Sequence, residues 1–244
     1  MAVTLLALLF AAAVLYTAAG QAGASGYLAV MALHGLDPAT MRPTALTLNI
    51  LVGSYATWRM GRAGWLDPRV LWGWLVGSVP LSFIGGLTVL PNAWYRGLLG
   101  GLLVLIGLRV WWDAGRARTG VPSGTPPRVV QWVGGAAIGL VSGLTGVGGG
   151  VLLGPLLLTM RWADPRRAAG LTTPFILVNS TAALAGAAMT MPALPAALPA
   201  YAAATLAGAV IGGHLAISRF SPATLQRMMA VVLLLGGVAA LLPR

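Results

Sequence analysis

The sequence predicts an all-α integral membrane protein, a polytopic helical bundle of two inverted repeats. Of its 244 residues, 58% are hydrophobic and only 8% are charged, and the mean hydropathy is +0.86. Long uncharged runs recur along the chain, as membrane-spanning helices require. Two of these runs are interrupted by glycines, and each is followed by a similar series of apolar segments. No polar stretch is long enough for a soluble domain, so residues 1–244 are interpreted as a single membrane domain.

The charged residues exclude several functional classes. All fifteen basic residues are arginine, the net charge is +11, and the acids are Asp37, Asp67, Asp113 and Asp164. The arginines lie singly at the ends of apolar runs, which is typical of membrane topology signals and not of nucleic-acid binding. No cysteine is present, so neither a disulfide nor a thiolate metal site is expected. Four dispersed aspartates and two histidines do not form an enzyme site, and no metal or other cofactor is expected.

The uncharged run from Val129 to Met160 is too long for one ordinary span. It would measure roughly 48 Å as a straight helix, whereas the hydrocarbon core is about 30 Å thick. Gly146, Gly148, Gly149 and Gly150 mark where it can break. Backbone freed at membrane depth must be satisfied by protein, water or a ligand, and a new helix beginning near Gly149 would present unpaired N–H groups to an anion. The alternative is that the glycines only allow close helix packing.

The first half of the chain has the same arrangement. Val3–Ala19 is apolar, Gly20–Gly26 interrupts it, and Tyr27–Leu33 resumes. Residues 1–19 lack the basic start of a signal peptide and match a later part of the chain, so they are kept in the mature fold.

Six further segments are predicted to cross the membrane singly. They are 43–58, 70–90 and 97–112 in the first half, and 168–190, 200–218 and 228–242 in the second. Residues 113–128 are rich in Pro, Gly, Ser and Arg and form the one clear linker. The predicted organisation is therefore a first repeat (1–112), a cytoplasmic linker (113–128) and a second repeat (129–244).

Four ordered matches support the repeat, with a shift of four residues after the first. Gly20–Gly26 lies over Gly143–Gly149, Asp37-Pro38 over Asp164-Pro165, Leu48–Ser54 over Phe175–Thr181, and Ile84–Gly86 over Ile211–Gly213.

The arginines select between two topologies. If each broken run enters and returns as a hairpin, twelve arginines lie on one side, and only Arg42, Arg96 and Arg244 lie on the other. The positive-inside rule then places the linker in the cytoplasm and both chain termini outside. Each half consists of one hairpin and three crossings, an odd number, so the repeats are inverted. Inverted repeats with broken helices are a recurring plan of secondary transporters.

These motifs resemble a known family. Gly143–Gly150 with Pro155, followed by Phe175–Ser180, is similar to the TauE/SafE sulfite exporters, as is Ala45–Asn49 in the first half. The resemblance covers essentially the whole chain. It implies a transporter, not an enzyme, that carries sulfite or small organosulfur anions out across a bacterial inner membrane. The first half departs from the glycine pattern, with Ser25 and Tyr27 aligned to Gly148 and Gly150.

The candidate binding residues are the glycines of both breaks and the polar residues at and just after them. They are Gln21, Gly23, Ser25, Gly26, Thr47 and Asn49 in the first half, and Thr145, Gly146, Gly148, Gly149, Gly150, Thr172, Thr173, Asn179 and Ser180 in the second. The alternative is structural, since Ser and Thr often bond to their own helix and Asn can join helices. His214 is interpreted as interfacial, with proton coupling as its alternative role.

The resulting functional hypothesis is a secondary carrier that binds its anion near the midplane, between the two hairpin tips, and works by alternating access. The alternatives are an anion channel and a non-transporting membrane scaffold. The expected partners are a small anion and the lipid bilayer, without nucleic acid, and a homodimer is the one protein assembly considered.

Overall fold

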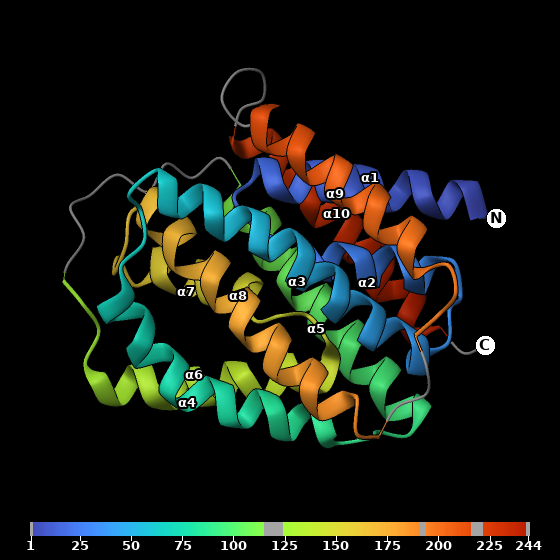
Figure 1. Ribbon diagram of the computed structural model, residues 1–244, viewed down its shortest axis with the longest axis horizontal. Helices are drawn as coiled ribbons and strands as arrows, with labels where there is room; N and C mark the ends of the chain where they lie inside the picture. The colour runs from blue at the N-terminus through green and yellow to red at the C-terminus, as the bar shows by residue number, and fades with distance from the viewer. Residues whose placement is uncertain (1, 115–123, 191–193, 216–221, 243–244) are drawn as a thin grey trace.

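The computed structural model describes residues 2–114, 124–190, 194–215 and 222–242, and these residues form ten α-helices and no strand (Figure 1). The prediction of an all-helical fold is confirmed. Part of the predicted linker, residues 115–123, lies outside the described residues.

Each half of the chain contributes five helices in the same order of lengths. The first half has α1 (Ala2–Ala18), α2 (Ala24–Leu33), α3 (Pro38–Arg62), α4 (Pro68–Leu87) and α5 (Asn92–Asp113). The second has α6 (Arg128–Thr145), α7 (Gly150–Thr159), α8 (Pro165–Ala187), α9 (Leu198–Leu215) and α10 (Pro222–Leu241). In both, a helix of 17 or 18 residues precedes one of 10 residues, and three long helices follow.

Both long apolar runs are broken at glycines, as the sequence predicts. Gly23 is the N-cap of α2 with φ 105°, and Gly149 is the N-cap of α7 with φ 76°. Gly146 ends α6 with φ 84°. Such left-handed conformations are strained for residues with a side chain, so glycine at these positions allows the chain to turn within the bundle.

The short helices return toward the end from which their partners start. In Figure 1, α1 runs inward from the N-terminus at the right and α2 returns to the right, whereas α6 starts at the left and α7 returns to the left. A 10-residue helix is about 15 Å long, half the thickness of the hydrocarbon core. This arrangement supports the hairpin topology over the one in which each broken run crosses once.

Among the described residues, four helices are long and apolar enough to cross a membrane by length and composition: α4, α5, α8 and α10. The helix α3 is outside this set although a crossing is predicted there; it combines three arginines with polar residues such as Asn49 and Ser54. The helix α9 is outside it as well.

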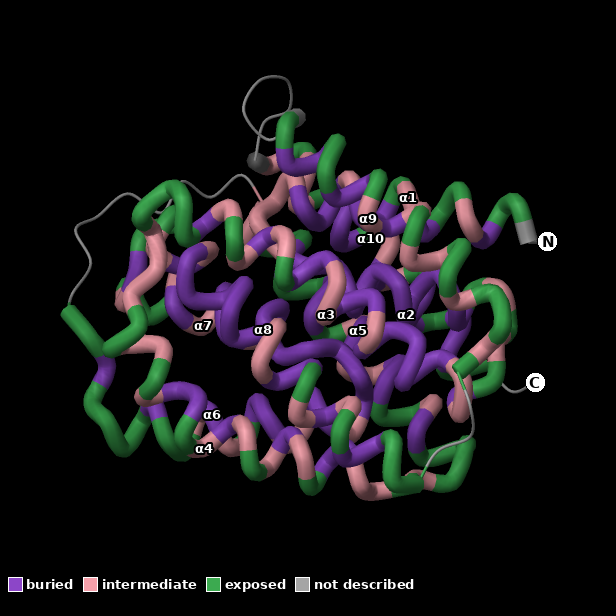
Figure 2. The backbone as a smooth tube through the Cα atoms, in the orientation of Figure 1, coloured by how far each residue is buried: buried purple, intermediate pink, exposed green. Residues whose placement is uncertain are grey.

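The core lies around α3 and α8, which pack against each other. Figure 2 shows buried backbone concentrated in α2, α3 and α8 at the centre and exposed turns along α4. In the most apolar 18-residue window, 61% of α8 is buried, against 33% in α4 and in α5. Large apolar side chains such as Leu105, Trp112 and Val133 lie exposed on peripheral helices, where they can face lipid.

The two halves exchange equivalent contacts. The first helix of each half packs on the fourth helix of the other, α1 on α9 and α6 on α4, and α5 packs on its counterpart α10. Two structurally equivalent halves would pack in this way, although their inverted orientation stays a prediction.

The helix caps correct the first repeat match. Matching the N-caps pairs Gly23 with Gly149, 126 residues apart, whereas the glycine pattern pairs Gly23 with Gly146. The next match, Asp37 with Asp164, is 127 residues apart, so the four-residue shift almost disappears. Ala22 and Ala24 are then the counterparts of Gly148 and Gly150. Glycine spacing was misleading because the first break has two glycines with positive φ and the second has three, Gly146, Gly148 and Gly149.

Candidate functional site

The start of α7 is an uncapped helix N-terminus inside the bundle. Gly148, Gly149 and Gly150 are buried, and no side chain caps the helix. In the described part of the chain, the main-chain N–H groups of these three glycines donate to no protein acceptor. They carry the partial positive charge of the helix dipole, which suits an anion.

The start of α2 differs because a side chain caps it. The Ala24 main-chain N–H donates to Asn49 Oδ1 at 3.1 Å. The amide nitrogen of Asn49 in turn donates to Ser180 Oγ at 2.9 Å. Both side chains are fully buried, so Asn49 on α3 joins the first hairpin to α8 of the second half. The structure thus brings two predicted site residues together across the halves.

Gly148 places the second hairpin against this pair. A Cβ at Gly148 would clash with the Asn49 amide nitrogen and lie 3.1 Å from Ser180 Oγ. Gly148 has φ 81°, a conformation that favours glycine. Both glycine breaks therefore meet at Asn49, and one cluster joins α2, α3, α7 and α8.

Ser142 is a member of this cluster that the sequence reasoning missed. Its hydroxyl is fully buried and has no hydrogen-bond partner among the residues that the structure describes. A Cβ at Gly149 would lie 3.5 Å from Ser142 Cβ and 3.0 Å from atoms of Ile138 and Phe175. An unpaired buried hydroxyl is costly, so a ligand or water that accepts from it would stabilise the site. The available signal was its position in the last turn of α6, seven residues before Gly149.

The four predicted threonines bond to their own helices. Thr47 donates to the Pro43 carbonyl at 2.9 Å, and Thr145 to that of Val141 at 2.7 Å. Thr172 and Thr173 both donate to the carbonyl of Ala169, at 3.3 and 3.1 Å. These are the hydrogen bonds to the residue's own helix that the structural alternative predicts.

Asn179 belongs to the joint between α4 and α8. Its side chain accepts a hydrogen bond from the Ser78 hydroxyl and donates to the Phe175 carbonyl at 2.9 Å. Ser82 Oγ donates to the Asn179 carbonyl at 2.9 Å. Its amide therefore joins α4 to α8, as the Asn49 amide joins α2 to α8.

Tyr16 covers the predicted residues of the first hairpin. Ser25 Oγ donates to Tyr16 Oη at 3.2 Å, and a Cβ at Gly26 would clash with the same ring. Gln21 is half-buried in the break itself. His214 is exposed on α9, and its ring Nδ1 lies 2.8 Å from the Val210 carbonyl, so it is outside the cluster.

Arg42 is a second residue missed by the sequence reasoning, which placed it in a loop at the outer side. It is only 1% exposed, and its guanidinium donates to the carbonyls of Thr88 at 2.8 Å and Gly86 at 2.7 Å, and to that of Gly85. These are the last carbonyls of α4, whose partial negative charge stabilises the cation. A Cβ at Gly146 would lie 3.2 Å from Arg42 Cγ, so this arginine also supports the end of α6.

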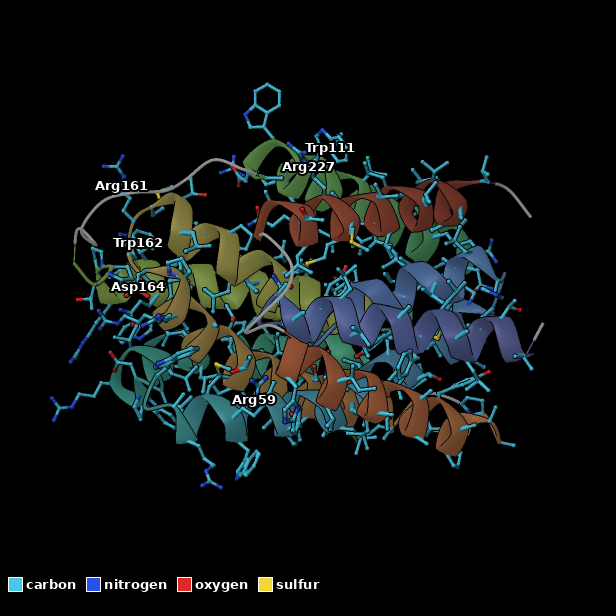
Figure 3. The ribbon with its side chains drawn as sticks, turned by 90° about the horizontal axis from the view of Figure 1, so that it is seen from above. Arg59, Trp111, Arg161, Trp162, Asp164 and Arg227 are labelled. Carbon is cyan, nitrogen blue, oxygen red and sulfur yellow. The ribbon has the colours of Figure 1, made fainter. Side chains whose placement is uncertain are left out.

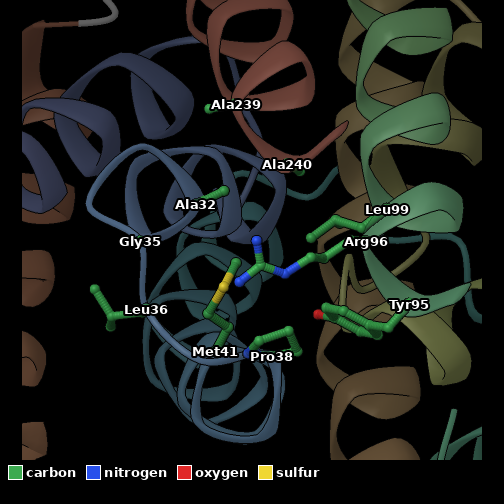
Figure 4. A pocket seen from close by; sticks show the side chains of 10 residues that line it. All are labelled: Ala32, Gly35, Leu36, Pro38, Met41, Tyr95, Arg96, Leu99, Ala239 and Ala240. Carbon is green, nitrogen blue, oxygen red and sulfur yellow. The ribbon is translucent and has the colours of Figure 1, made fainter. Parts of the chain in front are cut away.

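Tyr95 holds the same end of α6, since its hydroxyl donates to the Thr145 carbonyl at 2.9 Å. Beside it is a small hollow between α2, α3, α5 and α10 (Figure 4), lined mostly by apolar residues and by Arg96. It contains none of the predicted site residues.

The cluster around Asn49 is closed, because Asn49, Ser142 and Ser180 are inaccessible to solvent. A helix must therefore move before a solute can reach it.

A helical bundle with glycine-broken hairpins that meet in its interior is the architecture of a membrane transporter. The family described as "Sulfite exporter TauE/SafE" matches residues 5–240, and the chain belongs to this family. It is similar to "Probable membrane transporter protein y4hK" of Sinorhizobium fredii, with 38% identity over 235 residues and 95% of each chain covered. The comparison with solved structures gave no match. The protein is a membrane transporter and not an enzyme.

Proposed function

We propose that the protein is a secondary carrier that exports a small sulfur oxyanion or organosulfonate by alternating access. The anion binds near the bilayer midplane between the two hairpin tips. The observation that carries this proposal is the uncapped start of α7, where Gly148 lies against Asn49 and Ser180 and the buried Ser142 hydroxyl has no partner.

The donors in this cluster suit an anion that must be released. Main-chain N–H groups and the Ser142 hydroxyl offer hydrogen bonds worth about 1.5–3 kcal/mol each to a charged acceptor. A free arginine would bind the anion more tightly, whereas both terminal nitrogens of the buried Arg42 donate to carbonyls at the end of α4, and of its guanidinium nitrogens only Nε has no partner among the described residues.

Alternating access requires the closed cluster to open to each side in turn. Asn49 on α3 and Ser180 on α8 belong to different halves, so movement of one half relative to the other would separate them. In inverted-repeat transporters such movements open the site to the two sides alternately.

Anion transport is testable in proteoliposomes. We expect saturable uptake of sulfite or a small alkanesulfonate, and accelerated uptake of labelled anion when the vesicles contain unlabelled anion. A channel would show no such counterflow. Organic cations should neither move nor compete, and movement of a cation without an effect of anions would exclude the proposal.

The proposed orientation places both termini outside and the arginine-rich loops in the cytoplasm. The chain has no cysteine, so single cysteines can be labelled without background. Asn92→Cys, exposed at the start of α5, should react with an impermeant thiol reagent in intact cells. Ala63→Cys, exposed after α3, should react only after the cells are permeabilised. The opposite result would reverse the orientation.

A further inference from the structure

The arginine-rich end of the molecule has an open depression between the two halves. The loop before α4 and the first turn of this helix contribute Trp65, Asp67 and Arg69, and the start of α8 contributes Asp164, Arg166 and Arg167. Figure 3 shows Asp164 with Arg161 and Trp162 at the left end of the molecule. Gly170 of α8 packs directly on the Trp65 carbonyl, so the two sides of the depression are in contact below it.

Both carboxylates of the depression already accept hydrogen bonds from neighbouring groups. Asp164 caps α8 by accepting from the main-chain N–H groups of Arg166 at 2.8 Å and Arg167 at 3.0 Å. Asp67 accepts from the Arg167 guanidinium at 2.7 Å, and this bond holds the pKa of its carboxyl below the usual value. Asp67 therefore stays ionised at neutral pH and compensates Arg167.

Three arginines and two aspartates leave the depression with a net charge of +1. Among the described residues, neither Arg69 nor Arg166 has a carboxylate partner, and both are exposed. The guanidinium carbon of Arg166 lies 5.7 Å from the centroid of the Trp65 ring. The depression thus combines uncompensated positive charge with an aromatic wall, which fits an anion that carries a small apolar group.

The depression also lies on the element that leads to the buried cluster. Ser180 is fourteen residues after Arg166 on the same helix, so the two are roughly 21 Å apart along its axis. Positive charge at the rim of a carrier raises the local concentration of anions and their association rate.

We propose that this depression is a loading site, at which a small organosulfonate binds before it enters the bundle. The sulfonate group contacts Arg69 and Arg166, and the apolar group lies on Trp65. This inference rests on the proposed function for the identity of the transported anion.

The test compares Arg69→Gln/Arg166→Gln with wild type in vesicles whose arginine-rich face is accessible. The KM for ethanesulfonate should rise about five- to tenfold with little change in maximal rate, and its dependence on ionic strength should weaken. Trp65→Leu should raise the KM for ethanesulfonate more than that for sulfite, which has no apolar group.

Arg62→Gln is the matched control. Arg62 lies over Trp58, 5.3 Å from the ring centroid, and is near the same end of the molecule but outside the depression. An unchanged KM in Arg69→Gln/Arg166→Gln, or an equal change in Arg62→Gln, would overturn the loading site.

Titration calorimetry with ethanesulfonate on protein in detergent separates the loading site from the proposed transport function. If the wild type binds but does not transport, the proposed function fails, and weakened binding in Arg69→Gln/Arg166→Gln still supports the depression. If the wild type does not bind, or the variant binds equally, the loading site fails.

Discussion

Gly149→Val is expected to abolish anion transport while the protein still folds and purifies as a monodisperse species. Gly149 has φ 76°, a conformation that costs a residue with a side chain about 1–3 kcal/mol. Its Cβ would lie 3.0 Å from Ile138 and Phe175, and a β-branched side chain adds bulk at that point. The valine would therefore displace the uncapped N–H groups of α7 from the position in which they can meet an anion.

Gly101→Val provides the comparison. Gly101 lies on α5, and a Cβ there would have no neighbour within 4 Å, so the variant should transport close to the wild-type rate. The measurement is anion uptake per amount of monodisperse protein. Equal uptake by the two variants would mean that the glycine cluster serves packing alone, and that the anion binds elsewhere.

The hairpins could be predicted because their cause is local. An uncharged run that is too long for the bilayer must break, and glycine marks the place. The start of α7 therefore follows from the printed sequence within one residue, and that of α2, expected at Tyr27, within three. The repeat register could not be fixed in the same way. It depends on which of several positive-φ glycines caps the short helix, Gly23 in the first break and Gly149 in the second.

The composition of the candidate site depended on tertiary contacts. Asn49 and Ser180 meet although 131 residues separate them, and no spacing rule predicts that pair. Asn179, next to Ser180, faces Ser78 instead, because a one-residue step on a helix turns the side chain by about 100°. Ser142 was overlooked because an isolated serine in an apolar helix usually bonds to its own backbone, and here it does not.

Arg42 was misplaced for a different reason. An arginine near the start of an apolar run normally extends toward the membrane surface. Here the terminal carbonyls of α4 lie within reach, and they satisfy a cation inside the bundle without a carboxylate. The sequence contains no sign of this contact, because most of α3 and most of α4 lie between Arg42 and residues 85–88.

Arg42→Met is therefore expected to destabilise the fold more than any other single arginine substitution among the described residues. It leaves the buried carbonyls of Gly85 and Gly86 and the half-buried carbonyl of Thr88 without this donor, and an unsatisfied buried acceptor costs about 1–3 kcal/mol. It also removes the support beneath Gly146, so the transport rate per folded molecule should fall as well.

Arg59→Met is the matched control, because Arg59 makes the corresponding contact at the other end of α3. It donates to the carbonyl of Gly213 at 2.7 Å near the end of α9, and Gly213 is the repeat counterpart of Gly86. Arg59 is only half-buried and makes one such bond to the described residues, so water can replace it. Thermal unfolding of the detergent-purified proteins should show a clearly larger loss of Tm for Arg42→Met than for Arg59→Met. Equal losses would show that Arg42 supports the hairpin no more than an arginine at the interface does.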